Sequence, residues 1–190
     1  MHRIIVAAAL LASLGACKKA SVDVRNASPA EVQNAVAVSG ATDDIRPGKW
    51  QYRRTLLDVA SPGLSPEIVD HMKKMMGAAP PTERCLTADE AKKLDAAIAD
   101  APDNCRYDHY RMAGGQLDGA MRCTNPHGSQ ELSFKGSYSP DSTDVTVTNR
   151  IVNAADPSGS LAMTVNMKGK RVGACDAPPV RPATPARPAK

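Results

Sequence analysis

The stretch LAMTVNM at residues 161–167 alternates between two kinds of side chain along its full length. Its apolar members, which share one side of an extended chain, are Leu161, Met163, Val165 and Met167. The residues between them, Ala162, Thr164 and Asn166, are small or polar. A period of two residues is typical of a β-strand with one face against a core and the other toward water. The stretch therefore predicts a one-sided sheet.

The same alternation occurs in two preceding stretches, LSFKGSY at residues 132–138 and VTVT at residues 145–148. Turn-forming residues separate the three stretches, at 125–128, 139–141 and 156–159. Turns this short favour strands that follow one another in an antiparallel meander. We expect a mainly β chain of the α+β class, built as a curved antiparallel sheet or a partly open barrel with two or three short helices.

Helical signals precede the meander. A first strand begins at Gly48, and Ser65 and Pro66 then open a helix that continues to Gly77. A second helix begins at the capping box of residues 87–90. The apolar stripe of this second helix consists of Ala91, Leu94 and Ile98. We therefore expect a helical insert between the first strand and the rest of the sheet.

The two ends of the chain differ from its middle in composition. Residues 17–45 are predicted to be a tether with one possible short helix, because Ser28, Pro29 and Glu31 are typical of a helix start. Residues 46–175 contain the strand patterns and form the expected domain. Residues 176–190 are rich in Pro and Ala and can bury little surface, which predicts a disordered tail.

The N-terminus has the pattern of an export signal. A short basic start precedes an apolar run at residues 4–14, which as a helix spans only about 16 Å against the roughly 30 Å of a bilayer's hydrocarbon core. Residues 14–17, LGAC, resemble the lipobox of bacterial lipoproteins, which implies a signal peptide at 1–16 and a lipidated Cys17. An ordinary secretory signal that happens to precede a cysteine is the alternative. We expect the chain to bind a membrane through acylated Cys17.

Charge and sorting signals indicate a compartment but no polyanionic partner. Lys18, in place of an aspartate, follows the predicted lipidation site, and by the rule familiar from enteric bacteria this favours the outer over the inner membrane. The formal net charge of +4 lies at the two ends, so the body of the chain is near neutral. We expect a bacterial envelope protein that faces the periplasm and binds no nucleic acid.

Four cysteines remain once Cys17 is assigned to the anchor, and an even number in an exported chain predicts two disulfides. Metal binding is the weaker interpretation because the chain has no C-x-x-C pair. A turn at Gly114 and Gly115 would bring Cys105 close to Cys123, with the register of the two strands left open. Of three possible connectivities we favour Cys105 with Cys123 and Cys85 with Cys175.

An ordered set of short motifs resembles one family. Its members here are RPGKW at 46–50, CLT at 85–87, CRY at 105–107, the glycines at 114–115, Cys123 and GKRVGAC at 169–175. Together they resemble the small bacterial envelope proteins of the domain of unknown function 3617 family over about residues 46–175. The resemblance implies an exported, cysteine-bearing β-rich domain, often a lipoprotein. It implies no catalytic or binding residue.

A catalytic constellation is not evident in the sequence. Neither G-x-S-x-G nor H-E-x-x-H occurs, and the chain after residue 17 has only three histidines. Asp89 and Glu90 are adjacent carboxylates, but their place in the first turn of a predicted helix accounts for them as cap and dipole partners. We expect no enzyme, no catalytic residue and no cofactor.

A copper patch is the sharpest alternative to a purely structural chain. His71 and Met75 lie one helical turn apart, as do Met72 and Met76. Thioethers with an imidazole suit Cu(I) in an oxidising compartment. The plainer interpretation is an amphipathic helix that packs Met72 and Met76 against the sheet, and we favour it, so no metal site is expected.

A ligand pocket is the remaining alternative. Tyr107 and His109 would alternate along one face of the predicted hairpin, where a partly open sheet binds a lipid or a small apolar molecule. We favour a satisfied core or surface role for these side chains. The sequence thus predicts a lipid-anchored, non-catalytic binding or interaction module, whose partner is an envelope protein or a small apolar ligand.

Overall fold

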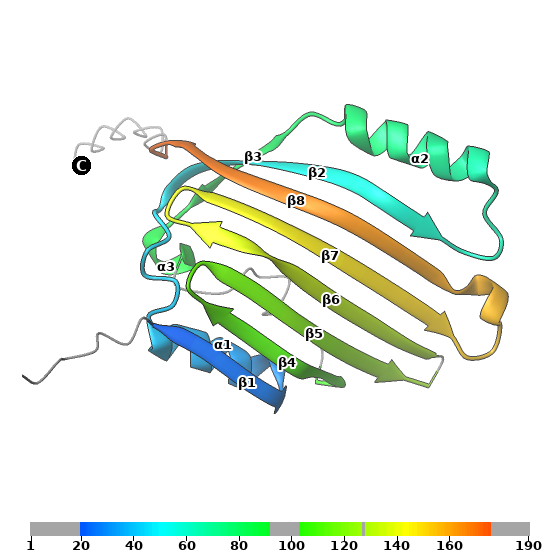
Figure 1. Ribbon diagram of the computed structural model, residues 1–190, viewed down its shortest axis with the longest axis horizontal. Coiled ribbons are helices and arrows are strands. Elements are labelled where there is room, and N and C mark those ends of the chain that lie inside the picture. Colours follow the sequence, from blue (N-terminus) through cyan, green and yellow to red (C-terminus); the bar gives the residue numbers. More distant parts are fainter. Residues whose placement is uncertain (1–19, 92–102, 127, 176–190) are drawn as a thin grey trace, which may run out of the picture.

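The computed structural model describes residues 20–91, 103–126 and 128–175. The predicted signal peptide at 1–16, the lipidation site Cys17, the tail at 176–190 and the helical residues Leu94 and Ile98 lie outside the described residues. The described strands form one eight-stranded antiparallel sheet. The sheet is curved and open (Figure 1). The expected mainly β fold class is confirmed, in the form of an open sheet and not a barrel.

The spatial order of the strands is β1-β4-β5-β6-β7-β8-β2-β3. Their bounds are β1 Ser21–Ala27, β2 Gly48–Ala60, β3 Thr82–Leu86, β4 Cys105–Ala113, β5 Gln116–Asn125, β6 Gly128–Ser139, β7 Ser142–Asn153 and β8 Leu161–Gly173. Strands β4 to β8 form the predicted meander, because each pairs with the next along the chain. Strand β2 then lies beside β8, which requires contacts between residues that are distant in sequence.

The helices are short. They are α1 at Pro29–Ser39, α2 at Pro66–Ala78 and α3 at Ala88–Ala91, with a 3-10 turn, η1, at Pro157–Gly159. The insert between β2 and β4 contains α2 and α3 as predicted, and also the unpredicted strand β3. Helix α2 packs against β2, and α1 packs against β1 and β4. Among the described helices, none is both long and apolar enough to cross a membrane.

The prediction of a tether at residues 17–45 is wrong for the described part of that segment. Strand β1 pairs with β4 along the edge of the sheet, and α1 folds back beneath it. Val32 and Val36 of α1 are fully buried in the core. The physical reason is that Val22 and Val24 alternate with charged residues, so β1 can present one apolar side to the same core. The folded unit therefore begins at β1.

Helix α1 begins as its sequence predicts. The Ser28 hydroxyl accepts a hydrogen bond from the Glu31 backbone N–H, and the Glu31 carboxylate accepts one from the Ser28 backbone N–H. This capping box satisfies two otherwise unpaired amides at the helix start. Gly40 ends the helix in a left-handed conformation with φ of 69°.

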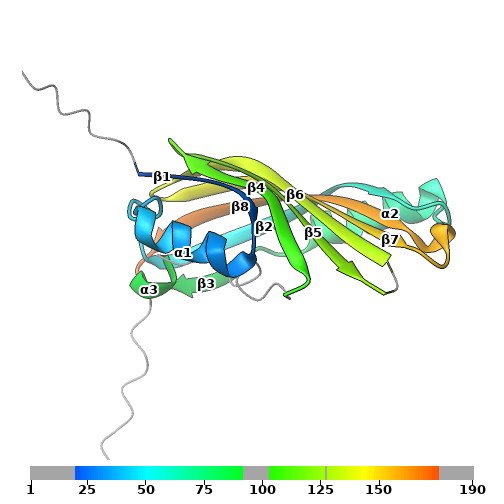
Figure 2. The same cartoon turned by 90° about the horizontal axis from the view of Figure 1, so that it is seen from below.

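One face of the sheet, here called the inner face, carries the core. A row of paired positions crosses six strands on this face: Tyr110, Gly119, Phe134, Val147, Val165 and Leu56. Helices α1 and α3 lie on the same side of the curved sheet in Figure 2, and α1 covers the β4 end of the row. The opposite, outer face carries most of the polar strand residues, so the sheet is largely one-sided as predicted, although Gln130 and Asn149 hydrogen-bond to each other on the inner face.

Candidate functional site

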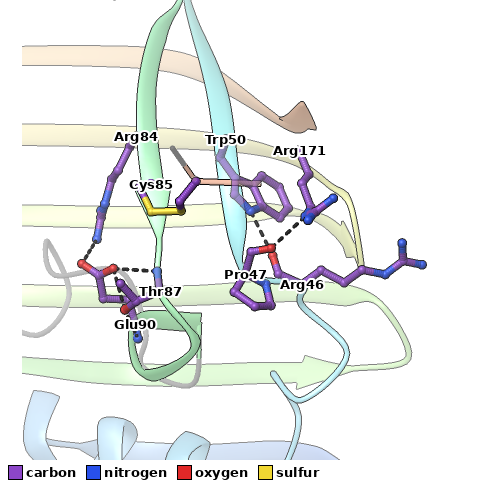
Figure 3. Close-up of a disulfide and its surroundings, with 9 residues drawn as sticks. Arg46, Pro47, Trp50, Arg84, Cys85, Thr87, Glu90 and Arg171 are labelled. Atoms are coloured by element: carbon purple, nitrogen blue, oxygen red, sulfur yellow. Dashed lines mark hydrogen bonds and ion pairs between the residues drawn. A yellow bond between two sulfur atoms is a disulfide. The ribbon is translucent and has the colours of Figure 1, made fainter. Parts of the chain in front are cut away.

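The disulfide between Cys85 and Cys175 connects β3 to the residues that follow β8. It joins positions 90 residues apart and is one of the pairs favoured from the sequence. Figure 3 shows Trp50 of β2 beside it, and the buried indole N–H donates to the Arg46 carbonyl oxygen at 3.0 Å. Arg171 of β8 donates from Nε to the Pro47 carbonyl oxygen at 2.8 Å. The disulfide and the Arg171 bond thus fix β2 between β3 and β8, and the Trp50 bond fixes the residues that precede β2.

The neighbouring carboxylate Glu90 belongs to a helix cap. Its Oε2 accepts hydrogen bonds from the Thr87 backbone N–H and hydroxyl, both at 2.8 Å, and its Oε1 pairs with Arg84 at 3.1 Å (Figure 3). These donors stabilise the charged form and lower the pKa of Glu90 to about 2. A carboxylate so firmly ionised is a poor general acid or base near neutral pH, and its hydrogen bonds to Thr87 give Glu90 the capping role that the sequence predicts.

The second disulfide, between Cys105 and Cys123, joins β4 to β5 at the end opposite their turn. Tyr107 lies opposite Met121 and His109 opposite Ala120, so Asp108 is an extra residue that forms a β-bulge. The register left open by the sequence is thus the direct one, in which Arg106 faces Arg122. Arg106 and Arg122 each interact with other side chains at the surface.

Both arginines have other partners. Arg122 Nη2 lies 3.7 Å from Asp108 Oδ2, and Arg122 Nε lies 3.5 Å from Glu131 Oε1. Arg106 donates from Nε to the Asn26 side-chain oxygen at 3.0 Å. The bulge therefore relieves the like-charge contact that the direct register creates, because it turns the Asp108 carboxylate toward Arg122.

The bulge also corrects the prediction that Tyr107 and His109 line one face of the hairpin. Tyr107 is buried on the inner face, whereas His109 lies on the outer face and its Nε2 is 2.9 Å from Asp118 Oδ1. The extra residue between them changes the alternation of sides along β4. The two residues therefore do not form a pocket together.

A buried aromatic cluster, not predicted from the sequence, surrounds Tyr107. The ring stands edge-on to Tyr110 at 5.9 Å and to Phe134 at 6.4 Å between centroids. The Tyr107 hydroxyl is the one buried side-chain polar atom of the described residues that has no hydrogen-bond partner. Burial raises the pKa of Tyr107 to about 12. The hydroxyl is thus neutral and unsatisfied.

A shallow hollow of about 270 Å³ opens on the outer face. Its polar lining residues include His109, Asp118, Ser133, Lys135, Thr146 and Thr148. The hydroxyl of Thr148 lies 3.1 Å from that of Thr164, and the Thr146 hydroxyl accepts from Asn166 at 3.2 Å. These cross-strand bonds engage both threonines in the sheet itself, as on a solvated β-surface.

The inner face is apolar well beyond the part that α1 covers. Strands β7 and β8 place five partly buried apolar side chains on it, here called the apolar strip: Val145, Val147, Met163, Val165 and Met167. Asn149, which pairs with Met163 and accepts a hydrogen bond from Gln130, borders the strip on the same face. Val145 and Val147 touch the buried core. The strip thus continues the core across the sheet as a less covered surface of aliphatic and thioether groups.

Helix α2 separates the four residues of the predicted copper patch into two pairs. Met72 and Met76 are partly buried, on the side of the helix that also contains Val69 and Lys73. His71 is exposed, and Met75 is 65% exposed. Met72 and Met76 therefore lie on the packed side of the helix, as the amphipathic interpretation predicts. Among the described residues, no group of three or more His, Cys, Asp or Glu side chains could hold a metal ion.

Comparison with known proteins gives one match. A family model described as "Protein of unknown function (DUF3617)" matches residues 45–175, which confirms the resemblance seen in the motifs. Comparison with curated proteins and with solved structures finds no match. The matched range begins after β1 and α1, so these two elements lie outside the family's common part.

Proposed function

The chain belongs to the DUF3617 family of proteins of unknown function, and from that premise we propose that it is a lipid-anchored, non-catalytic binding module of the bacterial envelope. Its ligand is an extended apolar chain, such as the acyl chain of a lipid, and its contact surface is the apolar strip. The observation that carries the proposal is the row from Phe134 through Val147 to Val165, which extends from the buried core onto the less covered strands.

The chemistry of the strip supports an apolar and flexible ligand. Valine side chains form a rigid floor, while the unbranched Met163 and Met167 adapt to ligands of different shape. Burial of apolar surface contributes about 25 cal/mol per Å², so a chain laid along two strands gains affinity without a deep pocket. The hollow on the outer face and a second one, lined in part by Thr42 and Asp43, have polar groups in their linings and serve such a ligand less well.

The anchor part of the proposal concerns Cys17. Strand β1 begins at Ser21, four residues later, so a lipid on Cys17 would lie within about 14 Å of the edge of the sheet along a fully extended chain. An acylated Cys17 would hold the domain against the periplasmic face of a membrane, the outer one in preference to the inner one, where acyl chains are abundant. The Cys17→Ser variant should move from the membrane fraction to the soluble fraction of the envelope, and its retention on the membrane would contradict the anchor.

A binding measurement tests the strip directly. The purified full chain should bind a fluorescent long-chain fatty acid at micromolar concentration. Val165→Asp places a charge in the strip and should weaken binding at least about tenfold. Thr164→Asp, one residue away on the outer face, should change the affinity less than about twofold.

A milder substitution separates a loss of binding from a loss of folding. Val165→Thr keeps the shape of the side chain but adds a hydroxyl, so it should weaken binding measurably even if Val165→Asp does not fold. The proposed ligand class would be overturned if the wild-type chain did not bind the fatty acid. It would also be overturned if the Val165 and Thr164 variants bound with equal affinity.

A further inference from the structure

Strand β1 is an edge of the sheet with a 7-residue length and one neighbour, β4, among the described strands. An edge strand presents backbone N–H and C=O groups that can pair with another strand. The opposite edge is protected differently. Strand β3 is only 5 residues long, and α2 packs against β2. Among the strands that the structure describes, β1 therefore forms the open edge.

The turn between β4 and β5 determines which backbone groups of β1 face outward. Ala113 and Gln116 close a two-residue turn and thus form a hydrogen-bonded pair. Hydrogen-bonding direction alternates along a strand, so Met112 and Tyr110 direct their backbone groups to β1. Their partners are Val22 and Val24, respectively.

The residues between these partners have the opposite direction. Asp23 and Arg25 consequently turn their backbone groups toward the open edge, and both side chains are exposed. Two such strands can pair antiparallel about Val24, with hydrogen bonds from the outward-facing residues of each. In this register Asp23 lies opposite the partner's Arg25, and Arg25 lies opposite the partner's Asp23.

From this self-complementarity we propose that β1 is the interface of a symmetric homodimer, in which two copies of the chain join their sheets edge to edge. A two-fold axis makes the same patch serve both copies, and SVDVRNA satisfies that condition because its two opposite charges flank the central Val24. Each opposed Asp–Arg pair on neighbouring strands adds stability, whereas like charges there oppose pairing. The interface does not depend on the ligand proposed for the apolar strip.

Exchanging the charges of Asp23 and Arg25 tests the proposed interface. Two differently tagged copies of the full chain are produced together in the bacterial envelope, extracted in detergent and isolated through one tag. Wild-type copies should co-purify. Asp23→Arg alone and Arg25→Asp alone should each reduce co-purification at least about tenfold, because each places like charges opposite one another twice.

Complementation distinguishes charge pairing from damage to the fold. Co-production of one copy carrying Asp23→Arg with another carrying Arg25→Asp should restore co-purification, and so should the double variant that carries both changes. Formation of the Cys105–Cys123 disulfide in every variant checks that the hairpin beside β1 is intact. Absence of wild-type co-purification, or single variants that behave as wild type, would overturn the homodimer.

A cross-link tests the register. Val24→Cys places the sulfur atoms of the two copies on either side of the two-fold axis, so an intermolecular disulfide should form between identical positions. Ser21→Cys is the matched control, because Ser21 would lie opposite the partner's Ala27 and far from the partner's Ser21. Cross-linking of Ser21→Cys but not Val24→Cys would reject the proposed register.

Discussion

Cys105 lies opposite Cys123 because β4 has one residue more than β5 between the turn and the disulfide. Regular pairing from the turn would set Cys105 against Thr124 and would turn Tyr107 to the outer face. The bulge at Asp108 takes up the extra residue, so that Tyr107 and Tyr110 both lie on the inner face.

Two single-residue deletions test this role of the bulge. Deletion of Asp108 should keep the disulfide and the aromatic cluster and should cost less than deletion of Arg111, with the loss confined to the pairing of Asn26 and Ala27 with β4. Deletion of Arg111 also allows Cys105 to face Cys123, but it turns Tyr110 outward and should cost about 3 kcal/mol or more. Urea unfolding with thiol labelling measures both, and equal losses for the two deletions would contradict the assigned bulge.

Removal of the unsatisfied Tyr107 hydroxyl should stabilise the domain. Tyr107→Phe keeps the ring contacts with Tyr110 and Phe134 and removes a buried polar group without a partner. We expect a gain of about 1 kcal/mol or more in the free energy of unfolding. Tyr110→Phe is the control, because the Tyr110 hydroxyl already donates to Met112 Sδ at 3.5 Å and its removal should not stabilise. Lower stability of Tyr107→Phe would mean that the hydroxyl has a partner after all.

The Phe134 ring packs directly against the backbone of Gly119. A Cβ atom at position 119 would overlap that ring, whereas one at Gly173, also in a strand, would meet nothing within 4 Å. Gly119→Ala should therefore lower the free energy of unfolding by about 1–3 kcal/mol, and Gly173→Ala should leave it nearly unchanged. Thermal unfolding of the two variants checks the difference, and a harmless Gly119→Ala would contradict the close packing.

Local sequence patterns predicted much of this fold, whereas the pairing of strands that are distant in sequence could not be predicted. The alternation at 161–167 predicted β8, and the glycines at 114–115 predicted the hairpin, because both patterns act over a few residues. The pairing of β2 with β8 depends on residues more than 100 positions apart and has no such signature. The bulge and the Tyr107 cluster depend on register, which a one-residue slip reverses.

The N-terminal segment did contain a signal that could have identified β1. Val22 and Val24 alternate with Asp23 and Arg25 in SVDVRNA, which is the same period of two that predicted the meander. The stretch nevertheless lies within the segment predicted to be a tether. The apolar strip could be anticipated residue by residue, but which part of the inner face α1 covers follows only from the fold.

The cap at Glu90 predicts a specific response to acid. Its folded-state pKa of about 2 lies below the ordinary value of 4.5, so its stabilising contribution is present above the ordinary pKa and is lost as pH falls toward the folded one. Wild type should lose stability between about pH 4.5 and pH 2, and Glu90→Gln should lose less over that interval. Urea unfolding at several pH values measures the difference, and parallel pH profiles would show that the cap does not stabilise the fold.

Helix α1 offers the sharpest test of where the folded unit begins. Val36 is 1% exposed and Val38 is 77% exposed, although they lie two residues apart on the same helix. Val36→Asp would bury an unpaired charge and should cost about 4 kcal/mol or more. Val38→Asp keeps its charge in water and should change stability by no more than about 0.5 kcal/mol. In a mere tether both variants would be neutral, so unequal unfolding midpoints would establish that the chain ahead of the family's common part completes the core.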